Sequence, residues 1–211
     1  MQKKCTFYIV RHGETEWNLK GFYQGQKDSS LTANGIQQAK DVSQKLKNIK
    51  FAAAFSSDLL RAKQTAEIIV LEHKMIVETK KILRERNYGR LEGTSIAKAQ
   101  QELKDTFRKF GDLSADIRFK TPLIDGSETD EKIATRLATF IRETSVAYPG
   151  KSVLVVCHGG IMRAFLIHMG FAPKEEMRAL AIENGGYFVL ESDGVDFFIK
   201  ETVGVHKGEM V

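Results

Sequence analysis

Short apolar runs alternate along this chain with longer stretches in which apolar residues recur at helical spacing. The short runs are rich in β-branched, aromatic or small residues, as in buried strands, and lie at 7–10, 51–55, 76–78 and 153–157. The stretches with helical spacing lie at 36–49, 59–70, 125–148 and from about 160 onward. This repeated succession of strand, loop and helix predicts an α/β fold with a mostly parallel sheet.

Polar residues between the runs indicate where the helices begin. Thr32 is expected to cap the first long helix, and Ser56-Ser57-Asp58 supplies residues typical of a cap for the second. Asp125-Gly126-Ser127-Glu128 is expected to open an amphipathic helix that ends before Pro149.

Two further segments complete the predicted organisation. Polar, helical residues at about 94–125 are expected to form a lid-like insertion within a single domain that spans 1–211. Apolar runs at 187–190 and 195–199, joined through a Ser-Asp-Gly turn, predict a hairpin at the edge of the sheet.

Two of the predicted strands end in a histidine. Arg11-His12-Gly13 follows the first strand, and His158-Gly159-Gly160 follows the run at 153–157. Open α/β sheets bind ligands at the carboxyl ends of their strands. A helix that begins at about Gly160 would point free N–H groups and the positive end of its dipole at this edge. The pattern therefore favours an anion, and phosphate is the natural first hypothesis.

Length and cysteine usage limit the possible classes of protein. A chain of 211 residues can bury about 70% of its unfolded surface in one core. Its two cysteines, Cys5 and Cys157, lie in predicted strands, where a free thiol packs as a small apolar group. We therefore expect a cytoplasmic protein without disulfides. The apolar run after Lys3 and Lys4 is too short for a signal peptide, and no run is long enough to span a membrane.

The net charge is positive, at +5, with 32 Lys and Arg against 27 Asp and Glu. Nucleic acid would fit such a charge, but the basic residues are scattered rather than gathered in one stripe. We expect a small anionic substrate and no nucleic acid, and the pattern leaves the oligomeric state open. Basic residues in and before the insertion indicate only that a polyanion would be bound: Arg86, Arg90, Arg108, Lys109, Arg118 and Lys120.

Three charged residues are candidates for chemistry, although each alone has an ordinary interpretation. Arg61 lies in the first turn of its predicted helix, where a cation opposes the helix dipole unless a bound anion offsets it. Arg11 and Arg61 both have the planar fork that fits phosphate, but a single arginine is more often a solvated surface charge. Glu85 lies among arginines and could be ion-paired and nothing more.

Four blocks of residues in order change this assessment. They are Arg11-His12-Gly13-Glu14-Thr15 with Asn18, Ser56-Ser57-Asp58-Leu59-Leu60-Arg61-Ala62 with Thr65-Ala66, Leu83-Arg84-Glu85 with Tyr88-Gly89 and Glu92-Gly93, and His158-Gly159. Together they resemble the histidine phosphatase superfamily, in its phosphoglycerate mutase-like branch. The resemblance covers nearly the whole chain, and each block lies on the expected element, whereas an Arg-His-Gly triplet alone would be weak.

This resemblance implies a three-layer α/β/α sandwich with a mostly parallel sheet and a C-terminal edge hairpin. It also implies that a neutral His12 attacks phosphorus and forms a phosphohistidine, with its tautomer set by a backbone carbonyl. Glu85 would protonate the leaving alkoxide and later accept a proton from water.

The remaining roles implied by the resemblance concern the phosphate. Arg11, Arg61 and His158 would surround the phosphoryl oxygens and stabilise their charge. Phosphate or substrate would also be bound by Asn18, Gln24, Gly25, and by Gly159 with the helix N-terminus that follows His158. No metal and no other cofactor is then needed.

Several alternatives stay open. A metal site is disfavoured because there is no pair of histidines at helical spacing, no cysteine cluster and no carboxylate-rich motif. A non-catalytic phosphoprotein-binding module is disfavoured because His12 and Glu85 are both present. A cofactor-dependent phosphoglycerate mutase shares the catalytic core, but the segment between Glu85 and His158 and the end of the chain are short for one. The segment Gly21–Gln26 resembles broad-specificity phosphatases, including those similar to α-ribazole phosphatase, so we favour a phosphomonoesterase.

Overall fold

The computed structural model describes residues 3–208, apart from the side chain of Arg178. Within this part, a six-stranded sheet has the order β3-β2-β4-β1-β5-β6. Its strands are β1 (Cys5–Arg11), β2 (Phe51–Ser56), β3 (Val77–Thr79), β4 (Ser152–Cys157), β5 (Ala181–Ser192) and β6 (Phe197–His206). The first four run parallel, whereas β5 and β6 form an antiparallel hairpin at one edge. The predicted α/β class is confirmed.

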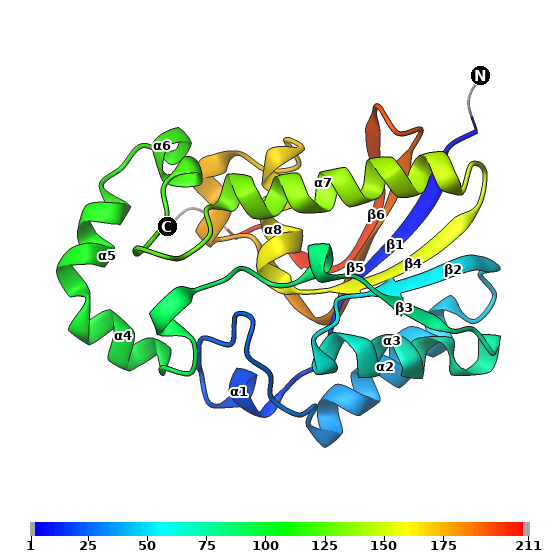
Figure 1. Cartoon of the computed structure of the whole chain (residues 1–211), viewed down its shortest axis with the longest axis horizontal. Helices are drawn as coiled ribbons and strands as arrows, with labels where there is room; N and C mark the ends of the chain where they lie inside the picture. Colours follow the sequence, from blue (N-terminus) through cyan, green and yellow to red (C-terminus); the bar gives the residue numbers. More distant parts are fainter. Residues whose placement is uncertain (1–2, 209–211) are drawn as a thin grey trace.

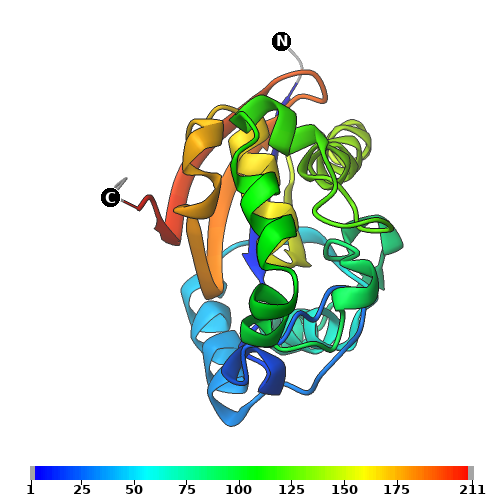
Figure 2. The same cartoon turned by 90° about the vertical axis from the view of Figure 1, so that its left-hand side faces the viewer.

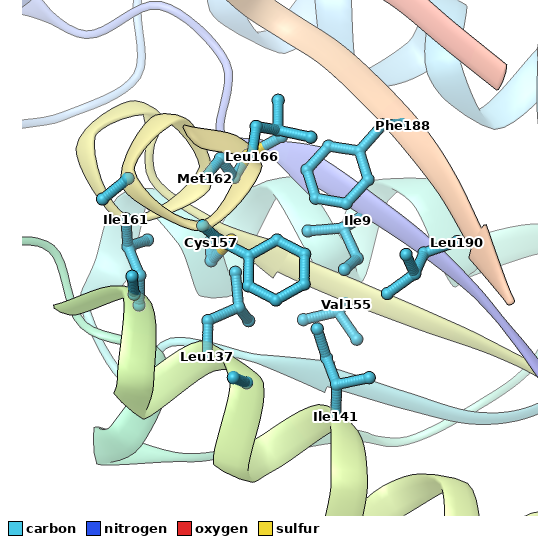
Figure 3. Close-up of a cluster of buried hydrophobic side chains, with 14 of the residues drawn as sticks. Ile9, Leu137, Ile141, Val155, Cys157, Ile161, Met162, Leu166, Phe188 and Leu190 are labelled. Atoms are coloured by element: carbon cyan, nitrogen blue, oxygen red, sulfur yellow. The ribbon is translucent and has the colours of Figure 1, made fainter. Parts of the chain in front are cut away.

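Helices cover both faces of this sheet (Figure 1). On one face lie α7 (Asp130–Ala147) and α8 (Gly159–His168), and on the other lie α2 (Ala33–Leu46) and α3 (Leu60–Val70). The strands alternate their side chains between the two faces, so each face has its own apolar layer. Figure 3 shows the larger layer, in which Ile9 and Val155 of the sheet pack against Leu137 and Ile141 of α7.

Short helices make up the rest of the secondary structure. They are α1 (Glu16–Leu19), α4 (Ile96–Glu102), α5 (Lys104–Gly111), α6 (Ala115–Lys120), and the 3-10 turns η1 (Leu71–His73), η2 (Lys81–Leu83), η3 (Gly89–Leu91) and η4 (Lys174–Arg178). The helices α4, α5 and α6 lie in the segment expected to be an insertion. They form an arm beside the end of the sheet at which the parallel strands stop, and Figure 2 views this arm from its outer side.

The first turn of α3 differs from the prediction. The side chains at 56–58 do not cap it, because the Oγ of Ser57 accepts the N–H of Leu59 and the helix begins one residue later. The carboxylate of Asp28 accepts the N–H of Leu60, and that of Arg61 at 3.4 Å. An acidic side chain from a distant loop therefore occupies the positive end of this helix, where it is favoured by the dipole.

Two other helix ends also differ. The helix α7 begins at Asp130 with Thr129 as its cap, not at Asp125, because Gly126 has a left-handed φ of 82° that interrupts a helix. The helix α2 has the predicted Thr32 cap, whose side chain accepts the N–H of Gly35, but it ends at Leu46 rather than Ile49.

Both cysteines are free and buried in strands, as predicted. Burial raises the pKa of Cys5 to about 12 and raises that of Cys157 as well. In residues 3–208, no helix combines the length and the apolar character that crossing a membrane requires. The cytoplasmic location stays a prediction.

Candidate active site

The residues that the sequence singled out converge on one cavity of about 370 Å³ at the carboxyl ends of β1 and β4. Arg11 and His12 reach it from the end of β1, Arg61 from the first turn of α3, and Glu85 from the loop after η2. His158 caps α8, and its ring centroid lies 5.1 Å from that of His12. The structure therefore brings together four chain segments that are far apart in sequence.

His12 is a buried imidazole whose tautomer is set by two contacts. Its Nδ1 lies 2.7 Å from the carbonyl oxygen of Gly13, which can only accept, so Nδ1 carries the hydrogen. Its Nε2 accepts the Nε–H of Arg61 at 3.3 Å and is therefore unprotonated. Burial, and then the positive charges of Arg61 and Arg11, hold the pKa of His12 well below its usual range. The ring is thus neutral, with Nε2 available as a nucleophile.

Arg61 is held in place by the loop at 25–28. Its Nη1 donates to the carbonyl of Lys27 at 2.7 Å and to the carboxylate of Asp28 at 3.0 Å, and its Nη2 donates to the carbonyl of Gly25 at 2.8 Å. These bonds fix the guanidinium plane and direct Nε toward His12.

Gly25, predicted to bind substrate, contributes this carbonyl at the cavity wall. Its φ of 55° lies in the left-handed region, and a Cβ there would lie 2.1 Å from a carboxylate oxygen of Glu92. A side chain at this position would displace the loop that holds Arg61.

Glu85 lies against the N-terminus of α8. Its carboxylate accepts the N–H of Gly160 at 2.8 Å, that of Ile161 at 3.1 Å, and that of Arg86 at 2.7 Å. The N–H groups at the start of this helix were predicted to bind phosphate, but those of Gly160 and Ile161 bind the carboxylate of Glu85 instead. The carboxylate takes them because negative charge is stabilised at the positive end of a helix.

His158 and Arg11 have unsatisfied polar atoms close to His12. Among the described residues, neither the two ring nitrogens of His158 nor the Nε of Arg11 has a hydrogen-bond partner. The Nη1 of Arg11 donates to the carbonyl of Ile182 at 2.5 Å. Burial is the main cause that lowers the pKa of Arg11 to about 10, so it is charged at neutral pH, and burial with Arg61 holds the pKa of His158 well below its usual range. Buried polar atoms of this kind are usually satisfied, so these point to an anionic ligand.

Asn18 and Gln24, both predicted to bind phosphate or substrate, line the cavity but differ in what they can offer. The side-chain oxygen of Asn18 accepts the N–H of Thr15 at 3.1 Å, which leaves its NH₂ group as the donor to a ligand. Gln24 uses its NH₂ on the hydroxyl of Thr15 at 2.8 Å and its oxygen on Ser29 at 3.3 Å. Gln24 therefore holds the loop through both ends of its amide, and one N–H of its NH₂ group is left for a ligand.

Gly159 is required by its close approach to Arg11. A Cβ on Gly159 would lie 3.0 Å from the Nε of Arg11, and a Cβ on Gly160 would lie 2.4 Å from a carboxylate oxygen of Glu85. The glycine pair thus gives both side chains access to the cavity.

Sequence reasoning missed Asn184 and Asp28. Asn184, on β5, donates from Nδ2 to the carbonyl oxygen of His12 at 3.0 Å, across 172 positions in sequence. Asp28 supplies the carboxylate for both α3 and Arg61. Neither residue lies in a recognisable motif, because each acts through a long-range contact. Within residues 3–208, no group of three or more His, Cys, Asp or Glu side chains is placed to hold a metal ion.

Comparisons with known proteins agree with this geometry. Residues 7–203 match the family described as "Histidine phosphatase superfamily (branch 1)". The chain is 35% identical over 159 residues to the "Uncharacterized phosphatase PhoE" of Bacillus subtilis, which covers 75% of this chain and 74% of PhoE. It is 31% identical over 186 residues to a 2,3-bisphosphoglycerate-dependent phosphoglycerate mutase of Nitrobacter winogradskyi, over 84% of this chain and 86% of the mutase. The structure of a phosphoglycerate mutase from Bacillus anthracis superposes with a TM-score of 0.83 at 26% identity, over 96% of this chain and 94% of that one.

The neutral state of His12 makes a first prediction. Long-range ¹H–¹⁵N spectra at pH 6 should show the imidazole of His12 protonated on Nδ1 alone.

Because the pKa of His12 and of His158 is depressed in the folded state, the unfolded chain takes up these protons first as the pH falls through about 6.5. Their contribution to stability is therefore present above that pH and lost below it, at about 1.4 kcal/mol per pH unit for each ring. The urea-unfolded chain is the reference, and a His12 that is protonated on both nitrogens at pH 6 would contradict the assignment.

Proposed function

The chain belongs to branch 1 of the histidine phosphatase superfamily, and from this membership we propose that it is a metal-independent phosphomonoesterase that acts through a phosphohistidine at His12. Its substrate would be a small phosphorylated metabolite. The observation that carries the proposal is the neutral His12 in the cavity wall, with its Nε2 unprotonated and with unsatisfied nitrogen atoms on Arg11 and on the neighbouring ring of His158.

In the first step, Nε2 of His12 would form a bond to phosphorus while the bond to the ester oxygen breaks. The electron pair of the broken bond leaves with the alkoxide, which must be protonated. The Nδ1–H bond to Gly13 keeps the imidazole oriented and stabilises the positive charge that develops on it. In the second step, water attacks phosphorus, the P–N bond breaks, and neutral His12 is restored.

Charge on the transferring group would be neutralised by three side chains. When Nε2 bonds phosphorus it loses its lone pair, so the Nε–H of Arg61 is released from His12 and becomes a donor to a phosphoryl oxygen. The Nε of Arg11 and a ring nitrogen of His158 would donate to the others. Such preorganised donors provide most of the transition-state stabilisation in phosphoryl transfer.

Glu85 would carry the proton. A carboxylate has about four lone-pair sites, and three backbone N–H groups occupy three of them. One site is left for the proton that goes to the leaving alkoxide and is later recovered from water. The three bonds also hold the carboxyl group at the cavity wall while this exchange occurs.

A phosphoglycerate mutase is the second candidate, because this chain resembles a mutase as closely as a phosphatase. The preference for hydrolysis rests on the short segment between Glu85 and His158 and on the likeness of Gly21–Gln26 to broad-specificity phosphatases. A mutase must exclude water from the phosphohistidine until a second hydroxyl is bound, and a short segment is less able to do so.

Hydrolysis itself makes the second prediction. The protein, incubated with EDTA, should release inorganic phosphate from a panel of monoesters at an undiminished rate, because the arginines supply the charge that a metal would supply and His158 supplies a further donor. With 3-phosphoglycerate and 2,3-bisphosphoglycerate, interconversion of phosphoglycerates should be slower than the best hydrolysis. Mutase turnover about 100-fold faster than hydrolysis, a barrier difference of about 2.7 kcal/mol, would contradict the phosphatase assignment. Loss of activity in EDTA that one divalent ion restores would contradict metal independence.

The role of Glu85 makes the third prediction. Glu85→Gln should slow the phosphorylation step by roughly 10²–10⁴-fold for alkyl phosphates, which need a proton on the leaving oxygen. For p-nitrophenyl phosphate the loss should be much smaller, because p-nitrophenolate leaves without one. Single-turnover assays on both esters provide the internal control, since a purely structural defect would slow them equally. Equal losses would remove Glu85 from the acid role.

A further inference from the structure

A second cavity lies beside the first and is larger, at about 640 Å³. The two cavities share Tyr23, Tyr88 and Arg163 as walls. The centroids of the two tyrosine rings lie 5.0 Å apart, so the rings form one aromatic pair in the shared wall. The remaining lining residues of the second cavity are Arg86, Gln100, Phe107, Phe110, Arg118, Leu123, Asp130 and Met177. Apart from the backbone N–H of Arg86, which holds Glu85, the proposed reaction uses none of these residues.

Apolar side chains form much of this second cavity. Phe107 and Phe110 come from α5, and Leu123 comes from the loop after α6, close to a small apolar cluster that is separate from the main core. Both phenylalanines are only half-buried, so burial in the folded chain is incomplete. A ligand that covered these rings would gain the free energy of the remaining apolar burial. Cavities of this size and lining are typical of sites for organic molecules larger than a phosphate ion.

The charges in the second cavity are not balanced. Arg86 forms an ion pair with Asp130, which neutralises both. Arg118 donates to the carbonyl of Gly111 at 3.3 Å, and Arg163 has a buried Nε without a partner among the described residues. Within residues 3–208, neither Arg118 nor Arg163 forms an ion pair with a carboxylate. The walls therefore carry an excess of positive charge beside apolar rings, and Arg163 lies at the junction with the phosphate cavity.

We infer that the second cavity holds the alcohol part of the substrate, that this part has a bulky apolar or aromatic body, and that it bears a second acidic group bound by Arg163. This inference rests on the proposed function, because it places the phosphate ester between the two cavities. It gives the substrate class as an acidic phosphate monoester with an apolar body. Arg163 is a specificity residue in this account, and the bond that breaks is the one assigned above.

The test uses phosphonates, which bind but have no ester bond to break. Calorimetry compares methylphosphonate, 4-methylbenzylphosphonate and 4-(carboxymethyl)benzylphosphonate at low ionic strength. We expect the benzyl group to strengthen binding by about 10-fold or more, and the carboxylate to add about another 10-fold. Phe110→Ser should reduce the first gain. Arg163→Met should abolish the second gain, and Arg163→Lys should restore part of it.

Ile117→Ala is the matched control, since Ile117 lies on α6, is 54% exposed, and lines neither cavity. It should leave all three affinities unchanged. Equal affinities for the three phosphonates in the unmodified protein, or no binding of the larger two, would overturn the inference whatever the variants do. If the larger ligands bind as expected but no monoester is hydrolysed, the inference stands and the proposed function fails.

Discussion

The parallel pairing of β1 with β4 is the constraint on which the site depends. It aligns Arg11 with Cys157, and the N–H of His12 donates to the carbonyl of Cys157 at 3.0 Å just beyond the last pair. The residues that leave the sheet at this edge are therefore the two histidines, with their rings 5.1 Å apart. A slip of one residue in this register would turn every side chain of β1 to the opposite face and separate the pair. Both strands are buried on both sides by α2, α3, α7 and α8, which is what fixes the register.

The electrostatics of the site follow from this crowding. Burial, and then the two guanidinium groups beside the imidazoles, hold the pKa of both rings well below the usual range, so the histidines stay neutral. Three arginines line the cavity, Arg11, Arg61 and Arg163, and their charge is only partly balanced by two carboxylates, Asp28 on Arg61 and Glu85 at the start of α8. A buried excess of charge is costly unless it is compensated. In the proposed reaction a phosphoryl group would supply the missing negative charge, and the same excess would then stabilise the charge of the transition state.

Much of the fold was predictable because apolar runs mark strands locally and the residues after each run mark the edge of the sheet. His12, Arg61 and His158 could be found in this way, since each lies next to a recognisable strand or helix start, whereas Glu85 lies in an irregular segment and was found only through the family resemblance. Asp28 and Asn184 could not, because their partners are 33 and 172 positions away and no local pattern records such contacts. The hydrogen bonds from the N–H groups of α8 to Glu85, 75 positions away at Gly160, were missed for the same reason. The second cavity is likewise formed by short helices whose packing has no sequence signature.

The assignment of His12 as the nucleophile rests on its place in the cavity wall and on its bond to Gly13, which puts the hydrogen on Nδ1 and leaves Nε2 unprotonated. Rapid quench in alkali, with a ³²P-labelled monoester in excess, tests it most directly, because a phosphohistidine survives alkali and is destroyed by acid. We predict that one acid-labile label per chain forms within the first turnover, on the peptide that contains Arg11 and His12, and that His12→Ala forms none. A label on His158, or steady turnover without any labelled protein, would contradict the account.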